Sequence, residues 1–230
     1  RADDGKCDDG LNEERAVHGA VVFFFKNGAP FYVKHDGNTS TNDGRYNYLK
    51  IKLEDNDPAS NMPNVSDIKD EVLVLENYKG QYPNQMLAVL NWAPAKASYS
   101  LSELQTLISD LGNDSKGYVM SNSVYADEAK TVIDAVKITE ANIFKDEKDA
   151  LSNPVNIYVE RVAAKVVVKA SEEYDLNKTA DYKPIGESSV VTTKVYAKIL
   201  GWDLYRDNSQ SSLLKVIYGD WTVDEVGFNW

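Results

Sequence analysis

The hydrophobic pattern of residues 153–170, NPVNIYVERVAAKVVVKA, predicts a long β-strand whose apolar face changes phase partway along. Ile157 and Val159 share one parity, whereas the small apolar residues that follow have the other. Such a strand keeps one core face only if an extra residue is inserted between the two halves. We therefore predict a β-bulge near Glu160 and Arg161, followed by four side chains that are buried together: Val162, Ala164, Val166 and Val168.

Several shorter apolar runs predict further strands. Residues 20–25 are apolar at both parities, which is typical of a strand buried on two faces, and the turn dipeptide Asn27-Gly28 follows them. Leu49, Ile51 and Leu53 alternate with polar residues, as expected for a half-exposed strand. The same reasoning predicts strands at residues 72–75, 86–92 and 191–199.

One helix is specified by its ends. Ser100 and Glu103 form the S-x-x-E pattern of a capping box, and Gly112 is placed to follow the last helical turn. Residues 146–151 predict a further helical turn before Pro154. The first helix is expected to present one apolar stripe, made of Leu101, Leu104, Ile108 and Leu111.

The chain is predicted to be a single mainly β domain with one or two short helices. No repeat, low-complexity tract or Pro-rich linker divides the 230 residues. We therefore expect one domain over residues 1–230, in which residues 1–15 form a flexible tail because they are rich in Asp and Gly.

Composition narrows the function classes. A formal charge of -11 disfavours nucleic acid, whose phosphates require a clustered cationic surface. No apolar run approaches the roughly 18 residues that span a bilayer. Cys7 is the single cysteine, so a disulfide within the chain and a cysteine-based metal cage are both excluded, and we expect an exposed thiol without function.

The supply of catalytic residues is poor. His18 and His35 are the two histidines, and their spacing matches no metal or triad motif. We expect neither catalysis nor a cofactor, although 36 acidic residues leave a paired-carboxylate hydrolase site as a remote alternative. Two acidic loops leave a bound cation open without matching a calcium-loop spacing, and their candidate ligands are Asp36, Asn38, Asp43, Asp55, Asn56 and Asp57.

Tryptophans near predicted strand ends offer a second alternative. Trp92, Trp202, Trp221 and Trp230 could stack on a sugar or seal the edge of a core. Sealing is favoured because large aromatic side chains are highly buried on average.

Three segments together resemble Bacteroidales fimbrillins, the subunits of surface pili. Residues 153–170 resemble the PV-x-I-Y-V-E-R-x-x-A-K-V signature of that family, and YVMSNSVY at residues 118–125 resembles its M-S-N-S segment. Gly201-Trp202 and the closing GFNW at residues 227–230 are similar to two further positions. The resemblance covers most of the chain in matching order, and it implies a transthyretin-like Greek-key β-sandwich that corresponds to the amino-terminal domain of the family.

The resemblance also implies a function. Fimbrillins are made as lipoproteins at the outer membrane and are cut after the first strand, often behind an arginine, for which Arg1 is the candidate here. The excised strand leaves a groove that a strand from another subunit fills, so the expected partners are other pilus subunits at the cell surface. The implied groove residues are Ala20, Val22, Phe24, Val162, Ala164 and Val166.

A surface-binding module is the alternative to a pilus subunit. In that case loops and exposed aromatic side chains of an adhesin would recognise a host protein or glycan. The sequence does not distinguish a shaft, an anchor or a tip role.

Overall fold

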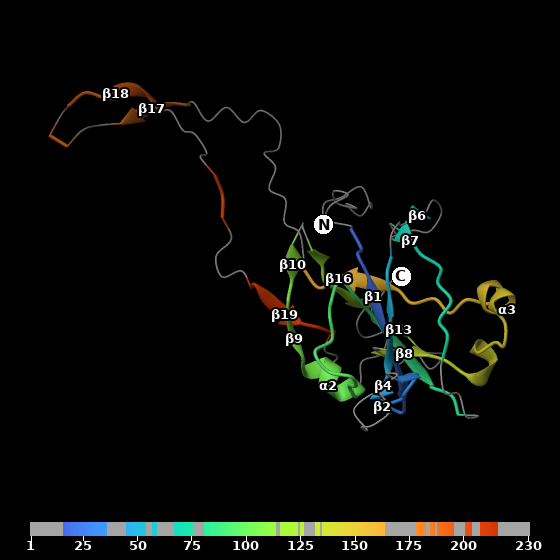
Figure 1. Cartoon of the computed structure of the whole chain (residues 1–230). Helices are drawn as coiled ribbons and strands as arrows, with labels where there is room; N and C mark the ends of the chain where they lie inside the picture. The colour runs from blue at the N-terminus through green and yellow to red at the C-terminus, as the bar shows by residue number, and fades with distance from the viewer. Residues whose placement is uncertain are drawn as a thin grey trace. The chain divides into compact units, whose positions relative to one another are not determined.

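The chain is mainly β and divides into two compact units. The first lies within Arg1–Ala163 and Ser209–Trp230, and the second within Ala164–Asn208. In the residues described below, two short α-helices accompany antiparallel strands, which confirms the predicted class (Figure 1). The single domain expected over residues 1–230 stays a prediction. The computed structural model describes residues 16–35, 45–53, 57–58, 67–75, 81–113, 116–123, 125–126, 132–133, 135–163, 178–182, 185–186, 188–195, 201–203 and 208–215.

A seven-stranded antiparallel sheet forms the centre of the first unit. Its strands follow the order β16-β12-β8-β1-β2, with β5 also beside β1 and β15 also beside β8. The bounds are β1 Ala20–Lys26, β2 Ala29–Pro30, β5 Tyr48–Ile51, β8 Gln85–Leu90, β12 Met120–Asn122, β15 Val136–Lys137 and β16 Val159–Arg161.

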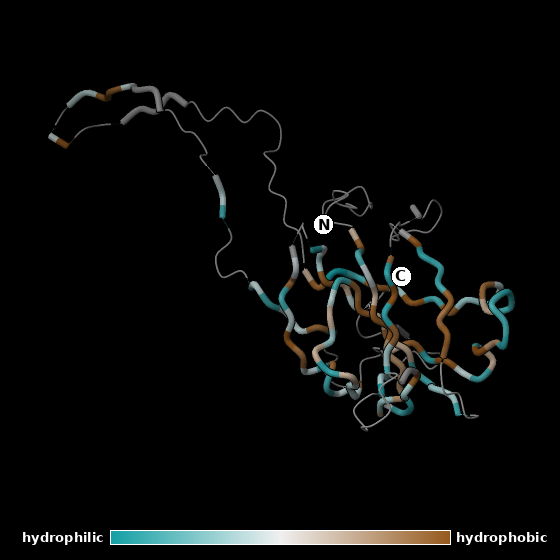
Figure 2. Tube along the Cα trace, viewed as in Figure 1, coloured by the Kyte–Doolittle hydropathy of each residue, from teal (hydrophilic) through white to brown (hydrophobic). Residues whose placement is uncertain are grey.

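Strand β1 is buried on both faces, as its sequence predicts. It pairs with β8 along one side and with β5 and β2 along the other, so neither side is an edge of the sheet. Its side chains alternate between two apolar clusters, and hydrophobic residues gather along the central strands (Figure 2). Core 1 comprises Val21, Phe23, Phe25, Tyr48, Leu87, Val89, Tyr99, Leu101, Leu104, Val119, Ala135, Leu213 and Leu214. Core 2 comprises Ala20, Val22, Phe24, Val33, Leu53, Ala88, Leu90, Met120 and Ile138.

The Asn27-Gly28 turn is confirmed. Both residues have positive φ, 52° and 77°, and the hairpin they close pairs Lys26 with Ala29. This is the arrangement of a type I′ turn, which Asn-Gly favours because its backbone twist matches that of the flanking strands.

The β-bulge predicted near Glu160 and Arg161 is wrong. Strands β12 and β16 pair one for one, with Met120 opposite Arg161, Ser121 opposite Glu160 and Asn122 opposite Val159. The same register continues at both ends, through Val162 N donating to Val119 O at 3.0 Å and Ser123 N donating to Tyr158 O at 2.8 Å. No residue is inserted across this stretch. Ala164, Val166 and Val168 lie outside the described residues.

The phase change has a simpler cause, which is that the sheet is covered on both faces. Val155, Ile157 and Val159 pack against core 2, whereas Val162 packs against core 1. Regular alternation therefore sends residues of opposite parity into two separate cores. A bulge is required only when one face alone is buried.

Helix α2 begins as predicted and ends early. It spans Leu101–Thr106, and the Ser100 and Glu103 side chains form the complete capping box. The predicted stripe fails beyond Leu104, because Ile108 lies in strand β9 with 60% of its surface exposed. Gly112 has φ of +89° and begins strand β10 rather than closing the helix.

A pairing from far along the chain explains this early end. Strand β9, Ile108–Asp110, pairs with β19, Gln210–Ser212, and Leu213 N donates to Leu107 O at 2.8 Å. Two residues later, β10 Gly112–Asn113 and β11 Gly117–Tyr118 form a second two-stranded ladder. Long-range strand pairing thus replaces the last helical turns.

The remaining elements are short. Helix α3, Glu147–Ser152, confirms the predicted turn before Pro154, and its N-cap Asp146 accepts from Asp149 N. Residues 72–75 do not form the predicted strand, although Leu73 and Leu75 pack against core 2. The other bounds are β3 Lys34–His35, β4 Arg45–Tyr46, β6 Asp57–Pro58, β7 Asp67–Ile68, β13 Tyr125–Ala126, β14 Val132–Ile133 and the 3-10 helix Glu140–Asn142.

The described part of the second unit contains one antiparallel hairpin. Strand β17, Lys178–Tyr182, pairs with β18, Val191–Val195. Strand β18 confirms the first part of the strand predicted at residues 191–199, and residues 196–199 lie outside the described residues. Exposed apolar side chains lie between the two strands, at Ile185 and Val190, and on β18 itself, at Val191.

Candidate functional site

Two of the segments that carry the family resemblance meet in the structure. Strand β12 contains Met120–Asn122 of the M-S-N-S segment, and strand β16 contains Val159–Arg161 of the IYVER segment. The two strands pair antiparallel, although nearly forty residues separate them in the sequence. Among the strands that the structure describes, β16 is the last in the order of the sheet, so this motif pair lies at one end of the described sheet.

The backbone of β16 faces two ways. The bonds of Tyr158 and Val162 to β12 show that the even-numbered residues of this strand direct their amide and carbonyl groups toward β12. Those of Val159 therefore face away from β12, since the direction alternates along an antiparallel strand. No described strand pairs with this outward row, so it is the part of the site to which another strand could add.

A polar cluster fixes the side chains of this strand on the core 1 face. Ser123 Oγ donates to Glu160 Oε1 at 3.2 Å, and Lys215 forms an ion pair with the same carboxylate. Both ion-pair side chains are about half exposed, so the pair adds little stability and mainly sets position. Beside it, Asn122 is buried and its Oδ1 accepts from Ala88 N at 2.7 Å, which ties β12 to β8.

The residues predicted to line a strand-accepting groove do not share one surface. Ala20, Val22 and Phe24 are buried in core 2 among other side chains of the same chain. Val162 is partly buried on the opposite face, against core 1. The described part of the predicted groove is therefore closed at β1, because that strand is paired on both sides. Arg1, Ala164 and Val166 lie outside the described residues.

The other end of the sheet is poorly suited to strand addition. Strand β2 has two residues and includes Pro30, which has no amide hydrogen to donate. On β5, the exposed Lys50 lies between Leu49 and Ile51. Short strands, proline and lysine are the features that protect natural sheet edges from pairing. Of the two ends, β16 is the better candidate.

Candidate catalytic and metal residues do not assemble among the described residues. His18 is exposed, and its backbone amide donates to Asn91 Oδ1 at 2.8 Å. No group of three His, Cys, Asp or Glu side chains that could hold a metal is found in the described part of the chain. His35 belongs to β3 and Asp57 to β6, but their side chains lie outside the described ones, as do Asp36, Asn38, Asp43, Asp55 and Asn56.

The tryptophans differ in their surroundings. Trp92 packs against core 1, with its ring 6.0 Å from Tyr99 and 6.3 Å from Phe23 between centroids. Trp202, in the second unit, has 52% of its surface exposed. Trp221 and Trp230 lie outside the described residues. Trp92 therefore seals a core, whereas Trp202 is accessible to a ligand.

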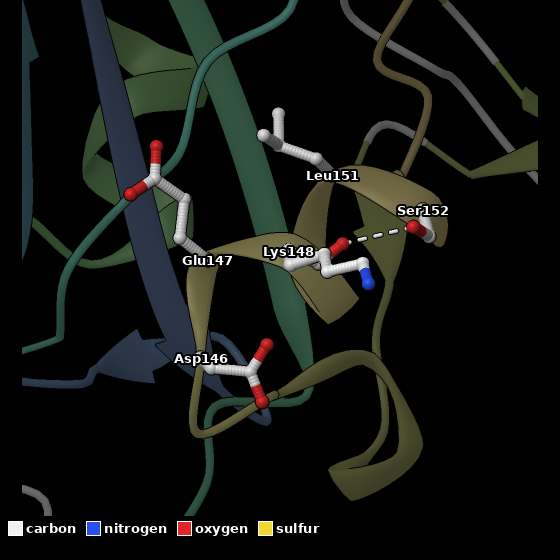
Figure 3. A pocket seen from close by; sticks show the side chains of 5 residues that line it. All are labelled: Asp146, Glu147, Lys148, Leu151 and Ser152. Carbon is white, nitrogen blue, oxygen red and sulfur yellow. Dashed lines mark hydrogen bonds between the residues drawn. The ribbon is translucent and has the colours of Figure 1, made fainter.

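A shallow depression beside α3 offers little chemistry. It is lined by Asp146, Glu147, Lys148, Leu151 and Ser152 (Figure 3). The Ser152 hydroxyl is already used, because it donates to Lys148 O at 2.8 Å. The depression combines a half-exposed leucine with flexible charged side chains and holds no buried polar group that could orient a ligand.

Sequence reasoning missed two residues of structural importance. Asn47 is fully buried, and the sequence feature that could have indicated this is its position between two aromatic residues, Tyr46 and Tyr48. Lys215 had no signal, because its partner Glu160 is far away in the sequence.

Two pKa values depart from their ordinary range, and neither belongs to a cluster of reactive groups. Burial raises the pKa of Tyr48, with the nearby Tyr46 and Tyr99 adding to the effect. The hydrogen bond from Lys96 lowers the pKa of Glu103, and the backbone amide of Ser100 adds to it.

Comparison with known proteins identified no matching family model, no similar curated protein and no similar solved structure. Within the described residues, no helix has the length and apolar character needed to cross a bilayer.

Proposed function

We propose that this chain is a structural subunit of a cell-surface fimbria, similar to Bacteroidales fimbrillins, and that it assembles by strand exchange at β16. The proposal includes the finer fold of a transthyretin-like Greek-key sandwich and processing at Arg1 of a lipidated precursor. Its partners are other pilus subunits, at the outer membrane and outside the cell. The role is one of assembly rather than catalysis.

The observation that supports the proposal is the position of β16 at the end of the sheet that the described strands form. This strand carries part of the segment that resembles the fimbrillin signature, and its pairing partner β12 carries the second one. Added strands bind through main-chain hydrogen bonds, while alternate side chains provide specificity. Val155, Ile157 and Val159 are half-buried on the core 2 face, so an added strand could extend this apolar surface.

A peptide-binding experiment tests the proposal. The probe is a synthetic peptide with the sequence encoded directly upstream of Arg1, which would be the excised first strand. We expect the peptide to raise the melting temperature of the chain, because a ligand that binds only the folded state stabilises it by mass action. A peptide of scrambled sequence serves as the control.

A proline variant locates the binding edge. Val159→Pro removes an amide hydrogen that faces away from β12, so the ladder to β12 is retained and an added strand loses a donor. The variant should fold and should no longer respond to the peptide. A native peptide that leaves the melting temperature unchanged, or one that stabilises both proteins equally, would contradict strand exchange at this edge.

Ligand binding at a surface is the second candidate, and one observation favours it. Trp202 is exposed and could stack on a sugar ring. Trp202→Ala should then abolish retention on a glycan array without changing the response to the strand peptide. Equal array binding by both proteins would remove this candidate.

A further inference from the structure

The turn between β1 and β2 contains the one Asn-Gly dipeptide of the sequence, Asn27-Gly28. Glycine has no side chain to hinder its own backbone nitrogen, so an asparagine before it is prone to intramolecular attack. Asn27 is exposed. We propose that Asn27 is a site of spontaneous deamidation and that Gln85 suppresses the reaction in the folded chain.

The reaction needs only this dipeptide and water. The Gly28 backbone nitrogen loses its proton to solvent and attacks the Asn27 Cγ, and the Cγ–Nδ2 bond breaks to release ammonia. The product is a five-membered succinimide. Water then attacks either of its two carbonyls and opens the ring, which leaves aspartate or isoaspartate. In sum, one water is consumed and the side-chain amide nitrogen leaves as one ammonia.

The structure hinders the first step. Gly28 N donates to Gln85 Oε1 at 2.7 Å, so the attacking nitrogen must give up a short hydrogen bond before it can lose its proton. Gln85 is itself held in register, opposite Phe25 in the pairing of β8 with β1. The hydrogen bond therefore persists as long as this end of the sheet stays closed.

Asn84 restrains the group that is attacked. Its Nδ2 donates to Asn27 Oδ1 at 2.6 Å, and its Oδ1 accepts from Asn27 N at 2.8 Å. The backbone of Asn84 is anchored in turn, because its amide donates to Phe25 O at 2.9 Å. A donor on Oδ1 also polarises the amide toward attack, so Asn84 both restrains the Asn27 side chain and activates it. Gln85 only hinders the reaction, and it is therefore the residue to test.

The two products differ in their effect on the fold. Aspartate at position 27 keeps an oxygen that can accept from Asn84 Nδ2, so the turn survives. Isoaspartate adds a carbon to the main chain and no longer fits a two-residue loop, whose length fixes the register of Phe25 with Pro30. Deamidation through isoaspartate should loosen the end of β1, where three consecutive phenylalanines are buried.

Ageing of the full chain at mildly alkaline pH tests the proposal. Conversion at Asn27 is followed by peptide mapping with mass spectrometry, and isoaspartate by enzymatic methyl transfer. We expect slow conversion in the folded protein and fast conversion in urea. Gln85→Met removes the acceptor at similar side-chain length, and it should speed conversion about fivefold, as expected for easier opening after loss of one hydrogen bond.

Gln85→Glu is the matched control, because its carboxylate still accepts from Gly28 N, and it should age like the unaltered chain. Circular dichroism checks that both variants are folded. Equal conversion in the folded chain and in urea would overturn the site's protection by the fold. Equal conversion in Gln85→Met and Gln85→Glu would overturn the role of Gln85.

Discussion

Asn47 joins three segments of the first unit through one buried side chain. Its Nδ2 donates to Tyr99 O at 2.9 Å and to Phe24 O at 3.2 Å, and its Oδ1 accepts from Tyr99 N at 3.0 Å. The side chain is fully buried, so water cannot replace any of these partners. Asn47 therefore connects β1 to the segment that leads into α2.

Asn47→Leu keeps the approximate volume and removes all three hydrogen bonds. It leaves the Tyr99 amide and two carbonyls buried without this partner, and each such group costs about 1–3 kcal/mol. We expect the free energy of unfolding in urea to fall by about 2–4 kcal/mol. Asn153→Leu is the control, because that side chain is exposed and donates to Asp149 O, and its effect should stay near about 0.5 kcal/mol.

Glu103 makes the free energy of unfolding depend slightly on pH, and the direction of its pKa shift fixes the sign of this dependence. Its folded pKa is lowered from 4.5, first by the hydrogen bond from Lys96 Nζ at 2.5 Å. A lowered folded pKa gives stability that is complete above the unfolded value and is lost as the pH falls through the folded value. Both side chains are about half exposed, so the contribution is at most about 0.5 kcal/mol.

Glu103→Gln isolates the charge, because glutamine can still cap Ser100 N. Urea unfolding should show the unaltered chain to be the more stable near neutral pH. The difference should vanish below the acidic range of Glu103 and shrink in high salt. A difference that persists unchanged in strong acid would assign the effect to packing instead.

At the scale of elements, alanine substitutions at Gly117 and Gly28 distinguish the cost of backbone strain from the cost of a steric clash. Both have positive φ, +75° and +77°, so alanine at either position costs about 1–2 kcal/mol of left-handed strain. A Cβ at Gly117 would also lie 2.2 Å from Asn91 Nδ2, whereas at Gly28 the nearest atom is 3.9 Å away. Asn91 cannot move freely, because its Nδ2 donates to Ala16 O at 2.8 Å.

Gly117→Ala should therefore destabilise the chain by about 1–3 kcal/mol more than Gly28→Ala. Chemical denaturation of the two variants under identical conditions measures the difference. Equal losses would mean that the segment around Asn91 adjusts and that φ alone requires glycine at position 117.

Elements specified by local chemistry were the predictable ones. The Asn27-Gly28 turn, the Ser100 capping box and the helical turn before Pro154 each depend on residues close together in the sequence, and all three are confirmed. The end of α2 was not predictable, because β9 pairs with a strand about 100 residues later in the chain. Local sequence carries no signal for such a partner.

The candidate site was predictable in its segments and not in its geometry. The sequence identifies the segments of β12 and β16, but a bulge follows from the pattern only if one face of the whole strand is buried. The apolar run of residues 20–25 already predicted a strand buried on both faces. Applying the same two-sided burial to β16 would have removed the need for a bulge. Ala20, Val22 and Phe24 lie on a strand that is buried on both faces and paired on both sides, and the local sequence carries no signal for that second pairing.

At the scale of the whole molecule, the first unit is completed by residues that follow the second unit in sequence. Strand β19 returns to pair with β9, and Leu213 and Leu214 are then buried in core 1 with 0% and 2% of their surface exposed. Lys215 adds its ion pair with Glu160 on β16. This segment therefore joins α2, β9 and the proposed strand-exchange edge in one core.

Leu213→Ala and Leu214→Ala should each lower the free energy of unfolding by about 2–5 kcal/mol, since a cavity opens in a closely packed core. Leu151→Ala is the control, because that leucine is half exposed on α3, and it should change little. A chain ended before residue 209 loses both leucines at once, a loss comparable to the whole stability of a typical domain of about 5–15 kcal/mol. It should fail to unfold cooperatively in calorimetry. A truncated chain that melts like the full one would show that core 1 closes without this segment, and the coupling between residues 209–215 and the β16 edge would then be wrong.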